Sequence, residues 1–99
     1  MVRCSNCGRD IDQPAVASIA GSIMGDEYIE SFYRCLWCGL YTVEILRDRF
    51  LGEAVVSMRG PISRPEGDAI VQRIAQCSRP WNKKCRCDVH QEHFGYALD

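Results

Sequence analysis

The sequence predicts an α+β fold in which an antiparallel sheet is followed by one capped helix and a second cysteine- and histidine-rich segment. Three patterns carry this prediction: two Cys-x-x-Cys-Gly units in the first half, a period-two alternation of apolar residues over 41–45, and a helix-capping signature at 63–66. We expect a β region over 1–60, and a helix and C-terminal segment over 61–99 that packs on it as a single compact unit.

Composition favours a one-domain globular protein. The 99 residues are 46% hydrophobic and carry a formal net charge of −1, which gives no general reason to expect a membrane or nucleic acid as partner. Seven cysteines are an odd number for a secreted disulfide scaffold, and neither a signal peptide nor a run that could span a bilayer is evident. We therefore expect a cytoplasmic protein whose Cys-x-x-Cys pairs bind metal.

Two strands are predicted between the Cys-x-x-Cys-Gly units. Residues 15–24 are rich in Ala, Val and Ile and predict the first, and Gly21 and Gly25 mark a turn. Residues 27–34 contain Tyr, Ile and Phe and predict the second. This second strand delivers the second cysteine pair to the expected metal.

Two further strands are predicted after the second cysteine pair. Tyr41, Val43 and Ile45 alternate with polar residues, as in a half-buried strand, and a polar turn is expected at 47–49. Residues 54–58 form a plausible fourth strand that pairs back on the third. Gly60 and Pro61 are expected to end the sheet.

A helix is predicted over residues 64–76. Ser63 and Glu66 form a capping box, in which the serine oxygen accepts a free backbone N–H, and Pro65 suits the first turn. The residues expected to face the core recur at helical spacing: Gly67, Ile70, Val71 and Ile74.

The two Cys-x-x-Cys-Gly units predict one structural zinc site with four ligands, Cys4, Cys7, Cys35 and Cys38. Two cysteines three residues apart on a tight turn present both sulfurs on one side, and two such turns complete a tetrahedron. Four thiolates leave no open position for substrate, so catalysis is not expected there. Iron accepts the same ligands. A redox dithiol or a disulfide pair is the alternative without metal, although a redox motif normally occurs singly.

This pattern resembles the zinc-ribbon superfamily, in which two Cys-x-x-Cys turns on antiparallel strands clamp one structural zinc. The resemblance covers about residues 3–46 and rests on the two units Cys4-Ser5-Asn6-Cys7-Gly8 and Cys35-Leu36-Trp37-Cys38-Gly39. It implies a metal-bound fold and no particular activity, because ribbons serve in transcription, translation and other processes.

A second zinc site is predicted from Cys77, Cys85, Cys87 and His90, with His93 as the other candidate for the fourth ligand. Cys85 and Cys87 share a face if the backbone is extended, and Cys87 and His90 share one if a short helical turn begins at residue 88. Three cysteines and one histidine are an accepted structural zinc set. An iron–sulfur cluster is one alternative, and a packed cysteine beside exposed histidines is another.

The loop before Cys85 is basic. It carries an aromatic residue, Trp81, and four cations: Arg79, Lys83, Lys84 and Arg86. Such a loop could contact phosphates and stack a base, or its charges could compensate thiolates while the indole packs. Binding two Zn²⁺ through seven thiolates would change the net charge from −1 to −4, because seven protons leave and four charges arrive, and this weighs against non-specific DNA binding.

The resulting hypothesis is a small protein with two structural zinc ions that acts as an interaction module for a protein or nucleic acid. The alternative is a redox or metal sensor whose Cys77–His90 site loses zinc on oxidation. A zinc enzyme with Glu92 as base is a third possibility that no other residue supports, and no small-molecule substrate is indicated.

Overall fold

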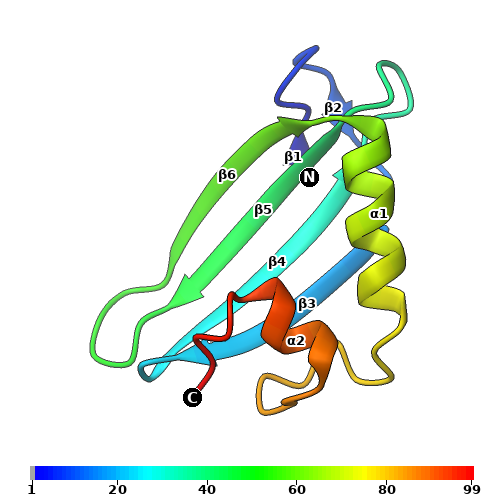
Figure 1. Ribbon diagram of the computed structural model, residues 1–99. Helices are drawn as coiled ribbons and strands as arrows, with labels where there is room; N and C mark the ends of the chain where they lie inside the picture. The colour runs from blue at the N-terminus through cyan, green and yellow to red at the C-terminus, as the bar shows by residue number, and fades with distance from the viewer. Residues whose placement is uncertain (1) are drawn as a thin grey trace.

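The computed structural model describes residues 2–99; residue 1, where the predicted β region begins, lies outside them. The fold is α+β, as predicted, with a four-stranded antiparallel sheet in the order β3-β4-β5-β6 (Figure 1). Its strands are β3 (Ala17–Ile23), β4 (Asp26–Arg34), β5 (Tyr41–Asp48) and β6 (Val55–Ile62). A second, two-stranded sheet that the sequence did not predict joins β1 (Val2–Arg3) to β2 (Asp10–Ile11).

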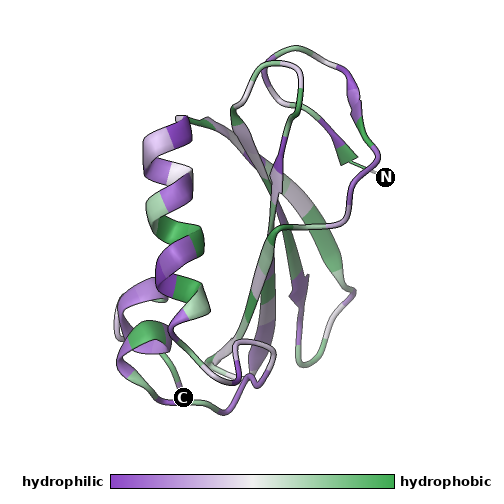
Figure 2. Cartoon of the chain, turned by 90° about the vertical axis from the view of Figure 1, so that its right-hand side faces the viewer, coloured by the Kyte–Doolittle hydropathy of each residue, from purple (hydrophilic) through white to green (hydrophobic). Residues whose placement is uncertain are grey.

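Two helices, α1 (Arg64–Ala75) and α2 (Asp88–His93), cover one face of the larger sheet (Figure 2). The sheet contributes Ile19, Phe32 and Val43 to the main core, and the helices contribute Ile74 and Val89. The opposite face of the sheet carries neither helix (Figure 2). The fold is therefore a helix layer on a sheet, with the core between them.

The alternation along β5 is only partly reflected in burial. Tyr41 and Val43 are buried, as predicted, but Thr42 between them is also buried. Its Oγ1 lies 2.9 Å from both the backbone N and the Oγ of Ser5. The first cysteine turn covers this part of the other face, which a strand pattern read alone cannot reveal.

Two predicted chain breaks lie inside strands. Arg47 still pairs with Val55 across the sheet and binds the Asp26 carboxylate, so the turn after β5 begins later than residue 47. The prediction that Gly60 and Pro61 end the sheet is also wrong, because β6 continues to Ile62. The register shifts between Tyr41 and Val43, and a bulge of this kind lets Gly60, with φ +137°, remain within the strand.

Helix α1 begins as the capping signature predicts. The N–H of Glu66 donates to Ser63 Oγ over 3.4 Å, and Pro65 occupies the first turn. Gly67 and Ile74 are the buried residues of α1, and they lie on the face toward the sheet. The helix ends at Ala75, one residue before the predicted end, and directs the chain toward Cys77.

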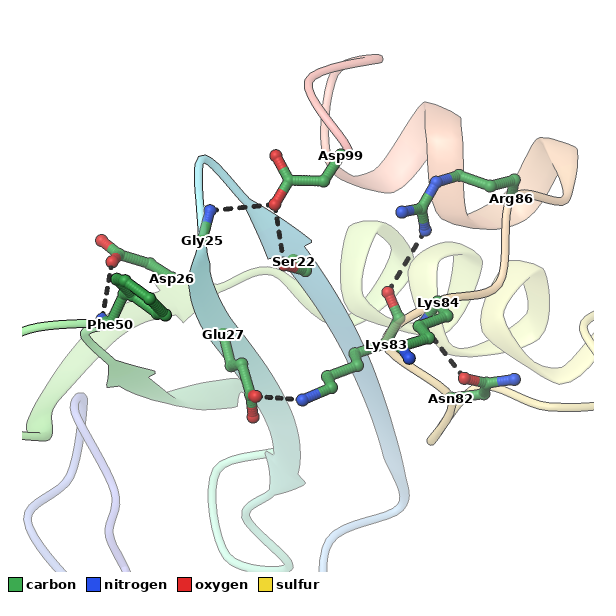
Figure 3. Close-up of polar contacts among 10 residues, drawn as sticks. All are labelled: Ser22, Gly25, Asp26, Glu27, Phe50, Asn82, Lys83, Lys84, Arg86 and Asp99. Carbon is green, nitrogen blue, oxygen red and sulfur yellow. Dashed lines mark hydrogen bonds and ion pairs between the residues drawn. The ribbon is translucent and has the colours of Figure 1, made fainter.

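The C-terminal segment is bound to the outer edge of β3. The N–H of Ala20 donates to the carbonyl of Pro80 over 2.8 Å, and the N–H of Asp99 donates to the carbonyl of Ser22 over 2.9 Å. The Asp99 carboxylate also accepts the N–H of Gly25 (Figure 3) and the N–H of Met24. The second cysteine cluster is thereby fixed against the sheet on both sides.

Candidate metal centres

Two near-identical turns present the first four cysteines. In the first turn the N–H of Gly8 donates to the carbonyl of Cys4 over 3.1 Å, and in the second the N–H of Gly39 donates to the carbonyl of Cys35 over 2.9 Å. The two glycines have φ values of +78° and +77°, a conformation that favours a residue without Cβ. The repeated Cys-x-x-Cys-Gly sequence thus has a repeated backbone structure.

The tertiary fold brings these two turns together. The Sγ atoms of Cys4 and Cys38 are 3.5 Å apart, and those of Cys7 and Cys35 are 3.6 Å apart. All four Sγ atoms lie within 4.8 Å of one another. A tetrahedron with metal–sulfur bonds of about 2.3 Å has an edge of about 3.8 Å, so the donor set fits one ion.

Electrostatics in this cluster favour a bound cation. Burial raises the pKa of the Cys4 thiol, but hydrogen bonds from the N–H groups of Cys7 and Asn6 and contact with the neighbouring sulfurs lower that pKa to about 6. The N–H of Arg9 lowers the pKa of the Cys7 thiol, but burial and the nearby sulfurs raise it to about 11. Four adjacent sulfurs cannot all ionise at neutral pH by themselves, and a divalent cation removes this conflict.

The second cluster combines residues from three segments. Cys77 follows α1, Cys85 and Cys87 belong to the loop before α2, and His90 lies on α2. The Sγ of Cys77 lies 3.9 Å from that of Cys85 and 3.5 Å from that of Cys87. These distances again match the edge of about 3.8 Å expected for a tetrahedral thiolate site.

The structure places His90, and not His93, beside these sulfurs. Nδ1 of His90 lies 3.4 Å from Cys77 Sγ and 3.2 Å from Cys87 Sγ, close to the edge of about 3.6 Å for a mixed sulfur and nitrogen tetrahedron. Nε2 of His93 lies 3.0 Å from Glu30 Oε1, and both side chains are mostly buried. His93 is therefore tied to the sheet and is not a surface group.

His90 has one unusual feature. Its side chain is 0% exposed, and its Nε2 has no hydrogen-bond partner among residues 2–99. Histidine ligands usually donate this second N–H to a carboxylate or carbonyl, which fixes the ring and raises its basicity. Burial also raises the pKa of the Cys87 thiol, but contacts with His90 and the neighbouring sulfurs lower it to about 6.

The basic loop is less available than its sequence suggests. Lys83 forms an ion pair with Glu27 on β4, and Arg86 donates to the carbonyl of Lys83 (Figure 3). Arg86 also donates to the carbonyl of Cys85. Trp81 is 72% exposed, so the packed indole considered from the sequence is wrong. Two of the four cations are thus already engaged within the protein, Lys83 with the sheet and Arg86 with the loop.

A hollow beside the first cluster was missed by the sequence reasoning. It has a volume of about 330 Å³ and is lined by Asp10, Ile11, Asp12, Gln13, Cys35, Leu36 and Trp37. Trp37 is 71% exposed, and the Arg9 guanidinium lies 4.3 Å from its ring centroid. The sequence signal for this hollow is the pair of large apolar residues at the tip of the second cysteine turn, Leu36 and Trp37.

Each cluster supplies four ligand atoms, so an ion held by all four has no vacant position for a reacting molecule. The chemistry that these centres support is therefore cross-linking of distant segments. No helix among residues 2–99 has the length and hydropathy needed to cross a membrane. In comparisons with known proteins, no protein-family model, curated protein or solved structure matched the chain.

Proposed function

We propose that this chain is a protein-interaction module held in shape by two structural zinc ions, and that its first cysteine cluster belongs to a zinc ribbon. The first ion would be bound by Cys4, Cys7, Cys35 and Cys38, and the second by Cys77, Cys85, Cys87 and His90. Zinc accepts both donor sets as closed tetrahedral sites, whereas iron without sulfide is less suited to the mixed set.

The observation that carries the interaction role is the exposed Leu36–Trp37 tip beside the hollow. An apolar pair at this position would be costly to expose unless a partner covered it, and aromatic residues are enriched in interface centres. The cysteine turn holds the pair rigid, so little side-chain and backbone freedom would be lost on binding.

The chemistry of the hollow favours a cationic segment of a partner protein. Asp10 and Asp12 line it, and their carboxylates would repel phosphates and attract lysine or arginine. The Arg9 guanidinium lies 4.3 Å from the Trp37 ring centroid, and this contact supports the indole as an acceptor of cations. A partner's lysine or arginine would lie between Trp37 and the two carboxylates.

Nucleic acid is supported less well. Lys83 and Arg86 are engaged within the protein, which leaves Arg79 and Lys84 as the other cations near Trp81. A holo charge of −4 would further weaken non-specific attraction to a polyanion.

Fluorescence can separate these surfaces because the chain has two tryptophans. The Trp81→Phe variant reports on Trp37 and the Trp37→Phe variant reports on Trp81. We expect a lysine-rich peptide to change Trp37 emission in a saturable way, and a glutamate-rich peptide of equal length to have no effect. Asp12→Asn should weaken the lysine peptide's binding.

The outcome against this proposal is an equal Trp37 response to both peptides, or none to either. A single-stranded RNA oligonucleotide provides the second arm. A saturable, salt-dependent change in Trp81 emission with RNA would favour the nucleic-acid alternative.

A sensor function at the second centre has one supporting observation, the unpartnered Nε2 of His90. Without a hydrogen bond to orient it, this ligand would bind metal more weakly than a supported histidine. The sensor alternative predicts that peroxide releases one zinc per chain from the second centre while the first centre keeps its ion. Simultaneous release of both ions would contradict it.

A further inference from the structure

The two edges of the larger sheet differ in whether another segment covers them. At the β3 edge, the carbonyl of Pro80 accepts the N–H of Ala20, and the N–H of Asp99 donates to the carbonyl of Ser22. At the other edge, no segment of residues 2–99 pairs with the outer side of β6 (Figure 1). Unpaired edges invite pairing with another strand, and proteins normally cover or disrupt them.

The outward backbone groups of β6 follow from the alternation in antiparallel sheets. Ala20 and Ser22 point out of the sheet at the β3 edge, and the register carries this alternation across β4 and β5. Ser57 consequently bonds inward to β5, whereas Val56 and Met58 direct their N–H and C=O groups outward. These two residues therefore form the hydrogen-bonding surface of the edge.

The same region is apolar and uncharged. Residues 55–58 read Val-Val-Ser-Met, and Val56 is 59% exposed. No lysine or proline protects this half of the strand, because Pro61 lies at the other end. Phe50 and Leu51, in the turn before β6, add further exposed apolar surface.

Val56 also ends a row of apolar side chains. The register aligns Ala20, Ile29, Leu46 and Val56 across the four strands, on the face away from the helices. Cross-strand neighbours on one face are the unit of sheet stabilisation. The row stops at the β6 edge, where the next neighbour would be a residue of an added strand.

We propose that β6 pairs in antiparallel fashion with β6 of a second copy of this chain, with Val56 on the two-fold axis. Val56 then faces Val56 of the second copy, and the apolar row continues through both sheets. The outward N–H and C=O of Val56 then bond to the same two groups of Val56 in the second copy, as in a hydrogen-bonded pair of an antiparallel sheet. Glu53 lies two residues before β6, and the added strand would extend the pairing to it; Glu53 then faces Arg59 of the second copy, which gives each dimer two opposite-charge pairs and no like-charge pair at these positions.

The charge pairing is what favours a second copy over an unrelated strand. Arg59 is half exposed, and its 3.5 Å contact with Glu30 leaves guanidinium donors free. An isologous contact uses each complementary group twice, so one favourable pair per chain gives two per dimer. This proposal does not depend on the identity of the metals or on the occupant of the Trp37 hollow.

Sedimentation equilibrium of the metal-loaded protein tests the proposal. We expect the mass to rise with concentration from the 11.2 kDa of one chain toward twice that value. Val56→Lys should abolish the rise, because two ammonium groups would meet on the axis. Val16→Lys is the matched control: it changes the same residue type at a similarly exposed position, 43%, away from this edge, and should leave the rise unchanged.

The Val56→Pro variant tests the same interface in the sedimentation experiment without adding a charge. The Val56 N–H points out of the sheet, so its loss would spare the chain's own ladder and remove a bond to the second copy. We expect a monomer with near wild-type melting temperature. A wild type that stays monomeric at all soluble concentrations would overturn the proposal, as would dimers of undiminished affinity in both Val56 variants.

The register has its own test. Glu53→Arg replaces both opposite-charge pairs with like-charge pairs and should raise the dimer dissociation constant roughly tenfold. Added salt screens these charges, so the dissociation constants of variant and wild type should become more similar as salt is added. An unchanged dissociation constant would overturn the register with Val56 on the axis.

Discussion

Gly67 on α1 lies so close to Tyr41 on β5 that a Cβ at position 67 would stand 2.0 Å from Tyr41 Cδ2. The helix can approach the sheet at this distance because the glycine has no side chain. Tyr41 is almost fully buried there, and its hydroxyl donates to Asp68 of the same helix. This contact fixes α1 on the sheet, and α1 in turn carries Cys77 to the second cluster.

Gly67→Ala should therefore destabilise the protein. In an exposed helix position this change usually stabilises by about 1 kcal/mol, but overpacking against the Tyr41 ring should cost about 1–3 kcal/mol. Denaturant unfolding of the metal-loaded protein measures the difference. The reverse change at an exposed site of the same helix, Ala69→Gly, should also destabilise, by about 1 kcal/mol. A raised unfolding midpoint for Gly67→Ala would contradict the close contact.

Removal of metal should unfold the chain. Structural zinc sites contribute roughly 10–16 kcal/mol of apparent binding free energy, which is comparable to or larger than the whole stability of a small domain. Native mass spectrometry with elemental analysis should find two zinc ions per chain, and Cys4→Ser and Cys77→Ser should each leave one. An apo protein with its full native circular dichroism would refute the structural role.

The two histidines should behave differently on substitution. His90→Gln should lose one zinc, whereas His93→Gln should keep both, because His93 binds Glu30 and lies outside the cluster. His93→Gln should still cost about 1–3 kcal/mol, because the mostly buried Glu30 carboxylate loses a hydrogen bond. The double variant Glu30→Gln/His93→Gln should recover part of this loss. Equal zinc content in the two single variants would contradict the assignment.

The Asp99 carboxylate should slow amide hydrogen exchange in the turn between β3 and β4. The N–H of Gly25, the hydroxyl of Ser22 and the N–H of Met24 hold its pKa below the usual 3.8, so the contact is complete at neutral pH and weakens as pH falls through that lowered pKa. Asp99→Ala should speed amide hydrogen exchange at residues 24 and 25 at pH 7. The amide of Glu66, which Ser63 caps, is the internal control and should be unaffected. The side-chain carbon shift of Asp99 in an acid titration checks the direction of its pKa.

Local sequence patterns were sufficient for much of the fold. The capping box located the start of α1, the alternation of Tyr41 and Val43 identified β5, and the spacing of the cysteines gave two four-ligand groups that the structure brings together. The helix start, the strand and each Cys-x-x-Cys turn depend on residues close in the chain, where backbone geometry relates spacing to direction, whereas the meeting of the Cys4 and Cys35 turns depends on the tertiary fold. The zinc-ribbon assignment and the identity of the metal stay predictions.

Other features depend on neighbours that are distant in the sequence. Gly60 and Pro61 remain inside β6 because a bulge against β5 absorbs them, and Thr42 is buried because Ser5 lies over it. Trp81 has a large apolar side chain of the kind that usually packs in a core, but it lies exposed.

The sequence by itself therefore determined which residues can hold metal and where the main strands and helix lie. Only the tertiary structure decided that His90 and not His93 joins the second cluster, that Lys83 is neutralised by Glu27, and that one sheet edge is covered while β6 is open. The physical reason is that ligand choice, ion pairing and edge coverage depend on which segments meet after folding, and the spacing along the chain does not encode those meetings.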